Sequence, residues 1–360
     1  MAPAFYLAIF PNPQQDLRSP LANTIYDIAR IAGVSIATVS RAFNNPKSVS
    51  PKTRDRIMKI AEETGYHPQA FAQGLASRRR NAVAVIVPVI SNYFFMEVLG
   101  GIQDKVSTTD SELHIVNIMP DSDPFEQVVH QVKRQWADGY ILISVHLSPE
   151  QYEQLHVFGQ PIVLLDDYHP DFDTVTADNI YGSFSATRHL LRMGAERIAL
   201  IVGDPQSQPV QTRIEGYRKA MENAGLYDES MIVSGDIGYR DGFTERSGYE
   251  AMQKILAWNE PPDAVFCTSD VKGIGALRAM REAGEEIPLI CYDNLSISEY
   301  MGLSTVAQPM HEMGFVAARD LFERIANPNR PFAHTMYTPE LVLRGSTMGR
   351  SIPVKGQTAP

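Results

Sequence analysis

The sequence predicts a small all-α headpiece that contains a helix-turn-helix, followed by an α/β core of two Rossmann-like lobes. Within residues 24–80, serine, proline and glycine separate three short amphipathic helical stretches. From residue 81 onward, buried-strand runs alternate with amphipathic helices, which is typical of parallel sheets covered on both faces. The length of 360 residues is enough for about two or three domains.

The first two helices are predicted within residues 25–41. Ala29 and Ala32 lie on one face of the first helix and are small enough to let two helices cross closely. Gly33 supplies the tight turn, because a residue without a Cβ adopts a left-handed backbone at little cost. Ser35 then caps the second helix through its hydroxyl.

A third helix is predicted between Ser50 and Gly65. Ser50 is its N-cap, Pro51 occupies the first helical position and Gly65 ends it. A short segment at 69–76 follows, and the basic residues of 77–80 lead into the first strand of the core.

This order of parts resembles the LacI/GalR family of bacterial transcription regulators. The resemblance covers residues 24–347 and rests on three motifs: Thr38-Val39-Ser40-Arg41, the Tyr66-x-Pro68 turn, and a segment ending in Ala72-x-x-Leu75. It implies a helix-turn-helix DNA-binding domain at 24–68 and a hinge helix with its linker at 69–80. Residues 81–347 would then form a two-lobed domain for effector binding and dimerisation.

The second helix is expected to read bases in the major groove. Arg41 can form a bidentate contact to guanine, while Ile36 and Ala37 offer apolar contact suited to a thymine methyl. Leu75 matches the family's wedge leucine, which enters the minor groove and kinks the operator. The residues expected to hold phosphates are Tyr26, Ser35, Thr38, Asn44 and Ser50.

The charge distribution agrees with DNA binding once it is divided by region. Residues 22–80 contain ten Lys or Arg against four Asp or Glu, a net charge of +6. The whole chain carries −10 and residues 1–21 carry none, so residues 81–360 carry −16. The positive charge therefore lies where the helix-turn-helix lies.

The N-terminal residues 1–23 precede the point where the family begins, and we expect a disordered extension or a misplaced start codon. The apolar run at 5–10 lacks a basic start and a cleavage site, so it is not interpreted as a signal peptide. No segment approaches the ~18 consecutive apolar residues of a membrane span. Cys267 and Cys291 are expected to be buried free thiols, and a cytoplasmic location follows.

The oligomeric state is predicted from the headpiece and from the C-terminal tail. Two headpieces that read a palindromic operator require a dimer, and the family dimerises through its lobes. The tail at 348–360 contains no leucine heptads, so it is not expected to form a tetramerising coiled coil. We therefore expect a homodimer bound to double-stranded DNA.

The core is predicted from its strand and helix pattern. Strands are expected at 83–89, 113–118, 139–144, 162–165, 197–202, 264–268 and 289–292. Helices are expected at 97–106, 123–136, 183–193, 211–223, 244–258 and 273–282. The resemblance implies a periplasmic-binding-protein-like core whose N-lobe is 81–178 with 310–337, and whose C-lobe is 179–307 with 338–347.

A small-molecule effector is expected in the cleft between these lobes, just beyond the carboxyl ends of the strands. Carboxylates, an amide and a guanidinium beside aromatic rings suit a sugar. The charged groups bind sugar hydroxyls in pairs, and the aromatic rings cover the apolar faces of the sugar ring. The positions that match family effector positions are Tyr93, Asp166, Arg213, Phe243, Ser269, Asp293 and Gln308.

Simpler structural roles compete at several of these positions. Asp166 and Asp293 can be helix caps or turn formers, and Arg213 can form a surface salt bridge. Three departures from the family also bear on the effector's identity. Ser269 stands where Asn is common, the loop before 289–292 is shorter, and 234–242 carries extra residues.

Three functions remain to be distinguished. The first is a transcription regulator, expected to be a repressor, whose DNA affinity is controlled by a sugar. The second is a solute-binding transport protein. The third is the same regulator controlled by a protein partner, as in the carbon-catabolite branch of the family. An enzyme is not expected, because the chain lacks a P-loop, paired zinc ligands and the dinucleotide glycine fingerprint; neither a cofactor nor a metal is expected.

Overall fold

The computed structural model describes residues 24–44, 46–66, 80–88, 93–118, 123–205, 207–238 and 242–348. The chain divides into two compact units, the headpiece at 1–80 and the core at 81–360. The predictions for the N-terminal extension, for the hinge helix with Leu75 and for the tail beyond 348 lie outside the described residues.

The headpiece consists of three helices packed around one small apolar core. Ile28, Val39 and Ile57 are completely buried and come from a different helix each. The helices are α1 (Ile25–Ala32), α2 (Ile36–Asn44) and α3 (Pro51–Thr64), with a 3-10 turn at Pro46–Ser48. This arrangement confirms the predicted all-α headpiece.

The boundaries of these helices follow from local backbone chemistry. Gly33 adopts a left-handed backbone with φ of 62° and ends α1. The hydroxyl of Ser35 accepts a hydrogen bond of 3.2 Å from the Thr38 amide, and Ser50 caps α3 in the same way. Each capping residue therefore satisfies an amide that the helix itself leaves without a partner.

The first lobe contains a six-stranded parallel sheet in the order β11-β5-β4-β3-β1-β2. Its strands are β1 (Ala82–Val87), β2 (Glu112–Asn117), β3 (Gly139–Ile143), β4 (Ile162–Leu165), β5 (Asp173–Ala177) and β11 (His334–Tyr337). Val83 and Val85 contribute to the apolar layer formed with α5 (Tyr93–Val106) and α13 (Met310–Ala326). Ala84 and Ile86 belong to the opposite layer, formed with α6 (Pro124–Arg134) and α7 (Pro149–His156).

The second lobe contains a six-stranded sheet in the order β12-β10-β9-β8-β6-β7, with β12 as its antiparallel edge. Its strands are β6 (Ile198–Val202), β7 (Ile232–Ser234), β8 (Ala264–Cys267), β9 (Leu289–Asp293), β10 (Ser304–Ala307) and β12 (Glu340–Val342). The helices α8 (Asn179–Arg192) and α9 (Gln208–Asn223) cover one face. The helices α10 (Glu245–Leu256) and α11 (Asp270–Ala283) cover the other, and α12 (Ser296–Tyr300) follows β9.

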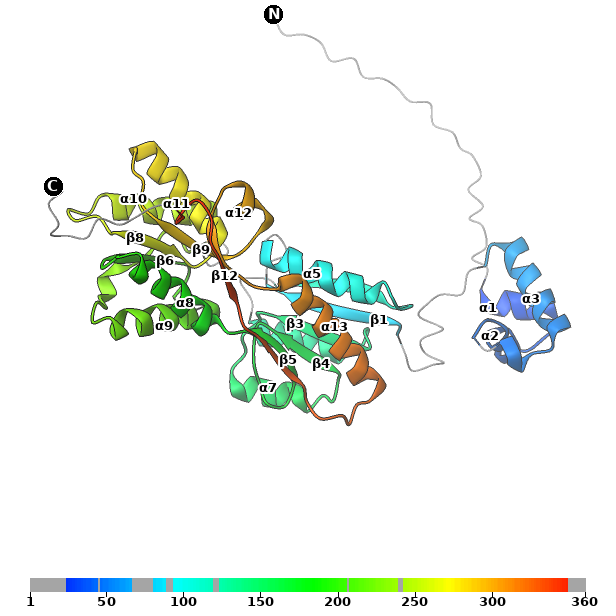
Figure 1. Ribbon diagram of the computed structural model, residues 1–360. Helices are drawn as coiled ribbons and strands as arrows, with labels where there is room; N and C mark the ends of the chain where they lie inside the picture. Colours follow the sequence, from blue (N-terminus) through cyan, green and yellow to red (C-terminus); the bar gives the residue numbers. More distant parts are fainter. Residues whose placement is uncertain are drawn as a thin grey trace, which may run out of the picture. The chain divides into compact units, whose positions relative to one another are not determined.

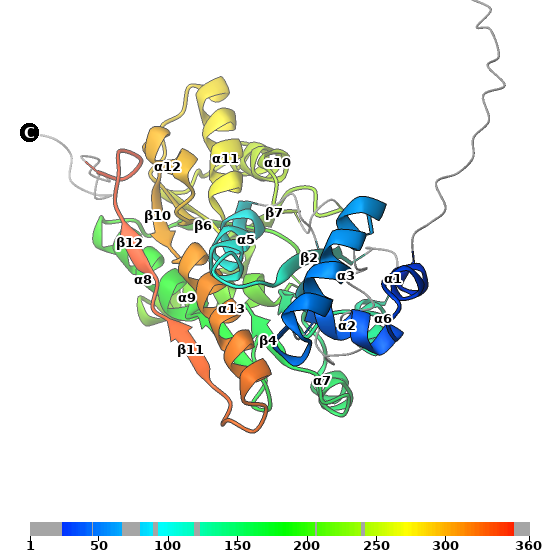
Figure 2. The same cartoon turned by 90° about the vertical axis from the view of Figure 1, so that its right-hand side faces the viewer.

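The chain passes between the two sheets three times, as Figure 1 shows. It leaves the first sheet after β5, returns from β10 to α13, and leaves again between β11 and β12. Figure 2 shows α13 beside α5, and the two helices cross so closely that a Cβ on Gly101 would lie 1.8 Å from the His311 carbonyl oxygen. The predicted α/β core of two lobes is confirmed.

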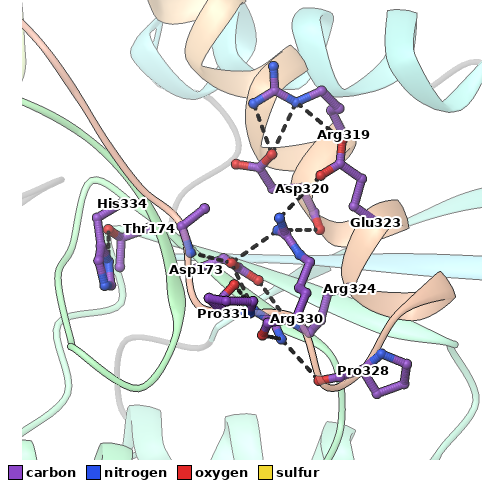
Figure 3. A network of polar contacts seen from close by, with 11 residues as sticks. Asp173, Thr174, Arg319, Asp320, Glu323, Arg324, Pro328, Arg330, Pro331 and His334 are labelled. Carbon is purple, nitrogen blue, oxygen red and sulfur yellow. Dashed lines mark hydrogen bonds and ion pairs between the residues drawn. The ribbon is translucent and has the colours of Figure 1, made fainter.

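A buried ion network holds the last crossover to the first sheet (Figure 3). The completely buried carboxylate of Asp173 accepts hydrogen bonds of 2.9 and 3.1 Å from Arg324 and lies 3.0 Å from an Arg330 nitrogen. Arg324 also donates to the carbonyl oxygens of Pro328, Arg330 and Pro331. The loop from α13 to β11 is therefore held by hydrogen bonds to the Arg324 guanidinium, whose charge Asp173 balances.

Within the part of the chain that the structure describes, no helix combines the length and the apolar character that crossing a membrane requires.

Candidate functional sites in the headpiece and the cleft

The exposed surface of the headpiece contains the residues expected to contact DNA. Tyr26, Ile36, Ala37 and Arg41 are exposed, whereas Val39 on the opposite face of α2 is completely buried. The Arg41 Nε donates a hydrogen bond of 3.1 Å to the Ala37 carbonyl, so this side chain lies along the helix.

The remaining headpiece positions have local roles that are compatible with phosphate contact. The hydroxyls of Ser35 and Thr38 lie 2.9 Å apart at the start of α2, and the Ser50 hydroxyl donates to Thr53 at the start of α3. Both pairs lie at helix N-termini, where backbone amides and the helix dipole favour an anion. The backbone of Asn44 belongs to α2, but its side chain lies outside the described residues.

In the core, strand ends of both lobes surround one cleft with a cavity of about 80 Å³. Four of the seven predicted effector residues line it: Asp166, Arg213, Phe243 and Asp293. Two side chains of the second lobe, Val271 and Leu295, also line it and belong to the apolar cluster of the first lobe. The cavity therefore lies where a ligand can touch both lobes at once.

Arg213 is the most highly connected side chain of this cleft. It is only 4% exposed and donates to the Asn179 side chain at 3.0 Å and to the Thr268 carbonyl at 2.5 Å. Its Nη2 lies 3.5 Å from an Asp293 oxygen, and its guanidinium carbon lies 3.9 Å from the centre of the Tyr292 ring. The structure thus places Arg213 in a buried network and not in a surface salt bridge.

Asp293 is the last residue of β9, and its carboxylate lies close to both Arg213 and Gln308. The Gln308 side chain donates a 2.8 Å hydrogen bond to one of its oxygens, the same oxygen that faces Arg213. Burial raises the pKa of Asp293 to about 6, although Arg213 and the Gln308 hydrogen bond oppose that rise. Gln308 itself does not line the cavity, so it positions Asp293 from behind.

Asp166 occupies the corresponding place at the end of β4 in the first lobe. The hydroxyl of Ser144 donates a 2.7 Å hydrogen bond to one of its oxygens. Burial raises the pKa of Asp166, and the nearby His146 is the main opposing influence. Each lobe therefore contributes one buried carboxylate whose environment includes a hydrogen-bond donor.

Sequence reasoning missed several residues that line the cleft, among them Ser144, His146, Ser207 and Pro209. Ser144 and His146 follow β3, so the rule that identified Asp166 and Asp293 was sufficient to find them.

Besides Gln308, two predicted effector residues do not line the cavity. Ser269 is completely buried, and its hydroxyl accepts from the Lys272 amide as the N-cap of α11. Tyr93 begins α5 and is 48% exposed, while the next two residues, Phe94 and Phe95, line the cavity. A step of one residue rotates a helical side chain by about 100°, which explains why the neighbours face the cleft.

The backbone around the cleft is held in a conformation that side chains disfavour. Of the seven described non-glycine residues with positive φ, five lie at the carboxyl ends of strands β3, β4 and β9 or within three residues beyond them. They are Ser144, His146, Asp166, Asp293 and Asn294. Such conformations cost of order 1–3 kcal/mol each and concentrate at binding sites, where the surrounding structure fixes the side chains.

The buried carboxylates lead to a prediction about stability and pH. Burial and the neighbouring Asp293 raise the pKa of Asp270 to about 7, above that of an unfolded aspartate. The folded protein therefore binds the proton of the Asp270 carboxyl more tightly than the unfolded chain does. The stability that this bound proton contributes is lost as the pH rises from about 4 through 7. We expect the free energy of unfolding, measured in urea, to fall over this range relative to that of Asp270→Asn. If the free energy of unfolding of the wild type, relative to that of Asp270→Asn, stays constant or rises with pH, the assignment is contradicted.

Comparisons with known proteins agree with this geometry. The family model described as bacterial regulatory proteins, lacI family, matches residues 24–69, and a periplasmic binding protein-like domain matches 187–347. The transcriptional regulator DegA of Bacillus subtilis is 34% identical over 341 residues, which are 91% of this chain and 98% of DegA. The chain belongs to the lacI family of bacterial regulatory proteins.

Solved structures extend the comparison to this lacI-family regulator's fold. The transcriptional regulator CelR in complex with cellobiose has 29% identity and a TM-score of 0.66, covering 90% of this chain and 99% of CelR. A lacI-family regulator of Enterococcus faecium with bound ribose has 27% identity and a TM-score of 0.65, covering 74% of this chain and 98% of that one. The lacI-family protein described here is thus a DNA-binding transcriptional regulator.

Proposed function

We propose that this regulator represses transcription from a palindromic operator and that a sugar bound in the interlobe cleft sets its affinity for DNA. The observation that carries the proposal is the pair of buried carboxylates, Asp166 and Asp293, contributed by different lobes to one cavity. Paired carboxylates accept hydrogen bonds from sugar hydroxyls, and Phe243 offers an aromatic face beside them. The cellobiose and ribose held by the two structural relatives support a sugar as the effector class.

The coupling between sugar and DNA follows from the position of these groups. A ligand that touches both lobes favours one lobe arrangement, and only its differential affinity for the two arrangements can move the equilibrium. The first lobe continues directly from Arg80 into β1, so a change in the spacing of two first lobes alters the spacing of two headpieces. A coupling of about 1–3 kcal/mol changes operator affinity roughly 5–150-fold.

The DNA-bound form is proposed to be a homodimer, because a palindrome presents the same half-site twice. In each half-site, Arg41 donates to guanine while Ile36 and Ala37 touch the neighbouring bases. Tyr26, Ser35, Thr38, Asn44 and Ser50 then hold the phosphates, and Leu75 enters the minor groove.

Replacement of Arg41 by alanine should therefore weaken operator binding by about 1–3 kcal/mol and relax the preference at one base pair of each half-site. Competition with operators that carry each base at that position measures the effect. Lys52→Ala, which removes an exposed cation of α3, serves as the control for general loss of charge. Equal weakening by Arg41→Ala on every sequence would make Arg41 a phosphate contact.

A thermal-shift screen with sugars and nucleosides tests the effector. A ligand present at 100 times its Kd stabilises the folded protein by about 2.7 kcal/mol, which is easily measured. A sugar that raises the melting temperature and changes operator affinity supports the proposal. If none does so, while a purified protein partner changes operator affinity, control by a protein replaces control by a sugar.

A further inference from the structure

A completely buried lysine lies behind the wall of the effector cavity. Lys272 belongs to the first turn of α11 and has an exposed fraction of 0%. The residue before it, Val271, lines the cavity, whereas Lys272 itself does not. Because burial removes the water around an ammonium group, such a group is retained only where the protein supplies compensating contacts.

The ammonium of Lys272 lies over the ring of Phe243. Its nitrogen is 3.5 Å from the ring centre, well within the ~6 Å over which a cation is attracted to an aromatic face. The same nitrogen donates a 3.3 Å hydrogen bond to the hydroxyl of Ser269, which is the N-cap of α11. The hydroxyl therefore holds the ammonium close to its own helix, and the charge of the ammonium attracts the ring.

Phe243 depends on such a contact for its direction, because its backbone belongs to neither a helix nor a strand. It lies between Gly242, whose φ is 74°, and Thr244, the N-cap of α10. Its side chain lines the cavity, and the residue is only partly buried. A side chain in this setting can choose among several staggered rotamers, and a charge fixed over one face of the ring favours a single one.

Lys272 also influences the cleft carboxylate of the same lobe. Burial raises the pKa of Asp293, Arg213 is the largest influence that opposes this rise, and the charge of Lys272 is a further one. The ammonium thus acts on two residues that line the cavity, Phe243 and Asp293, without lining the cavity itself. An apolar side chain of the same length would fill the space of Lys272 without either effect.

We infer that Lys272 is a positioning residue of the effector site, whose buried ammonium holds the ring of Phe243 in the wall of the cavity. The inference rests on the proposed sugar control and adds to it a residue that does not touch the sugar. Without the charge, the ring samples several rotamers, and the site is competent to bind for only part of the time. The apparent affinity for the sugar falls in proportion to that fraction.

A fluorine label on the ring tests the contact itself. In the full chain, para-fluorophenylalanine in place of Phe243 gives a single fluorine resonance, whose position depends on a charge over the ring. We expect Lys272→Met, which keeps the length of the side chain but removes its charge, to shift and broaden this resonance. Lys254→Met is the matched control, because Lys254 is exposed on α10 and donates to the Ser234 carbonyl, so its replacement should leave the resonance in place.

Calorimetric titration at pH 8 with ribose and with cellobiose tests the consequence for binding. At this pH, Asp293 with its pKa of about 6 stays ionised, so the effect of Lys272 on that carboxylate does not enter. We expect Lys272→Met to weaken sugar binding about ten-fold, as a ring that is correctly placed for about a tenth of the time would. In a protein that also carries Phe243→Leu, the same substitution should weaken binding no further.

Two results would overturn the inference while leaving sugar control intact. One is a fluorine resonance that Lys272→Met leaves unchanged, and the other is an equal loss of sugar affinity with and without Phe243→Leu. If neither ribose, cellobiose nor any other sugar of the thermal-shift screen binds, the proposed sugar control and the inference both fail.

Discussion

Replacing Arg213 by alanine should remove the response of operator binding to sugar and destabilise the core by about 3–5 kcal/mol. The reason is that Arg213 serves two purposes from one buried position. It faces the cleft carboxylate Asp293, and it also satisfies the Asn179 side chain and the Thr268 carbonyl. Its removal takes away the largest influence that favours the charged form of Asp293, so the pKa of that carboxyl rises further.

Urea unfolding and operator titration with and without sugar measure the two effects of Arg213→Ala. Arg218→Ala is a matched control, since Arg218 is exposed on the same helix and donates to Tyr227 at the surface. Arg213→Lys keeps the positive charge but loses the planar guanidinium with its paired donors. We therefore expect this variant to recover part of the stability but almost none of the sugar response. Full sugar response in a folded Arg213→Ala protein would make this arginine purely structural.

The second large effect is expected from Asp173, which does not line the cavity and belongs to the ion network of Figure 3. Asp173→Ala leaves Arg324 and Arg330 without the carboxylate that balances their charge, in a place where Arg324 is almost completely buried. Removing one partner of a buried ion pair lowers the free energy of unfolding by about 3–5 kcal/mol, because the remaining charge is left without compensation. We therefore expect a lower urea midpoint for the core and loosening of the loop between α13 and β11.

Two controls define the origin of this effect. Asp171→Ala removes an exposed carboxylate two residues away and should change stability by less than about 0.5 kcal/mol. Asp173→Asn keeps one acceptor for the arginines and should fall between wild type and Asp173→Ala. A stability of Asp173→Ala equal to that of Asp171→Ala would show that the network in Figure 3 contributes no net stabilisation.

The headpiece could be predicted closely because its boundaries are set by local chemistry. Ser35, Ser50 and Gly33 act through their own backbone or through amides two or three residues away, so the sequence contains the whole interaction. The buried parallel strands were also predictable, since they form continuous apolar runs. β5, β7, β10, β11 and β12 were not, because they are short and mix polar with apolar residues.

The cleft was predictable only in part, because lining a cavity depends on side-chain direction. Asp166 follows β4, Asp293 ends β9 and both line the cavity, whereas Ser269 lies two residues after β8 and caps a helix instead. Gln308 contributes to the site by donating a hydrogen bond to Asp293, although its own side chain does not line the cavity. A sequence identifies which residues reach a strand end, whereas packing of the following helix decides which of them face the ligand.

Operator titration of the full chain, with and without the best-binding sugar of the screen, tests the central claim most directly. A palindromic DNA duplex with a fluorescent label reports the affinity at fixed salt, since phosphate contacts make binding strongly salt-dependent. The account predicts a change of roughly 5–150-fold in Kd for the wild type and none for Arg213→Ala. An operator affinity that the bound sugar leaves unchanged would contradict the claim that the cleft controls the headpiece.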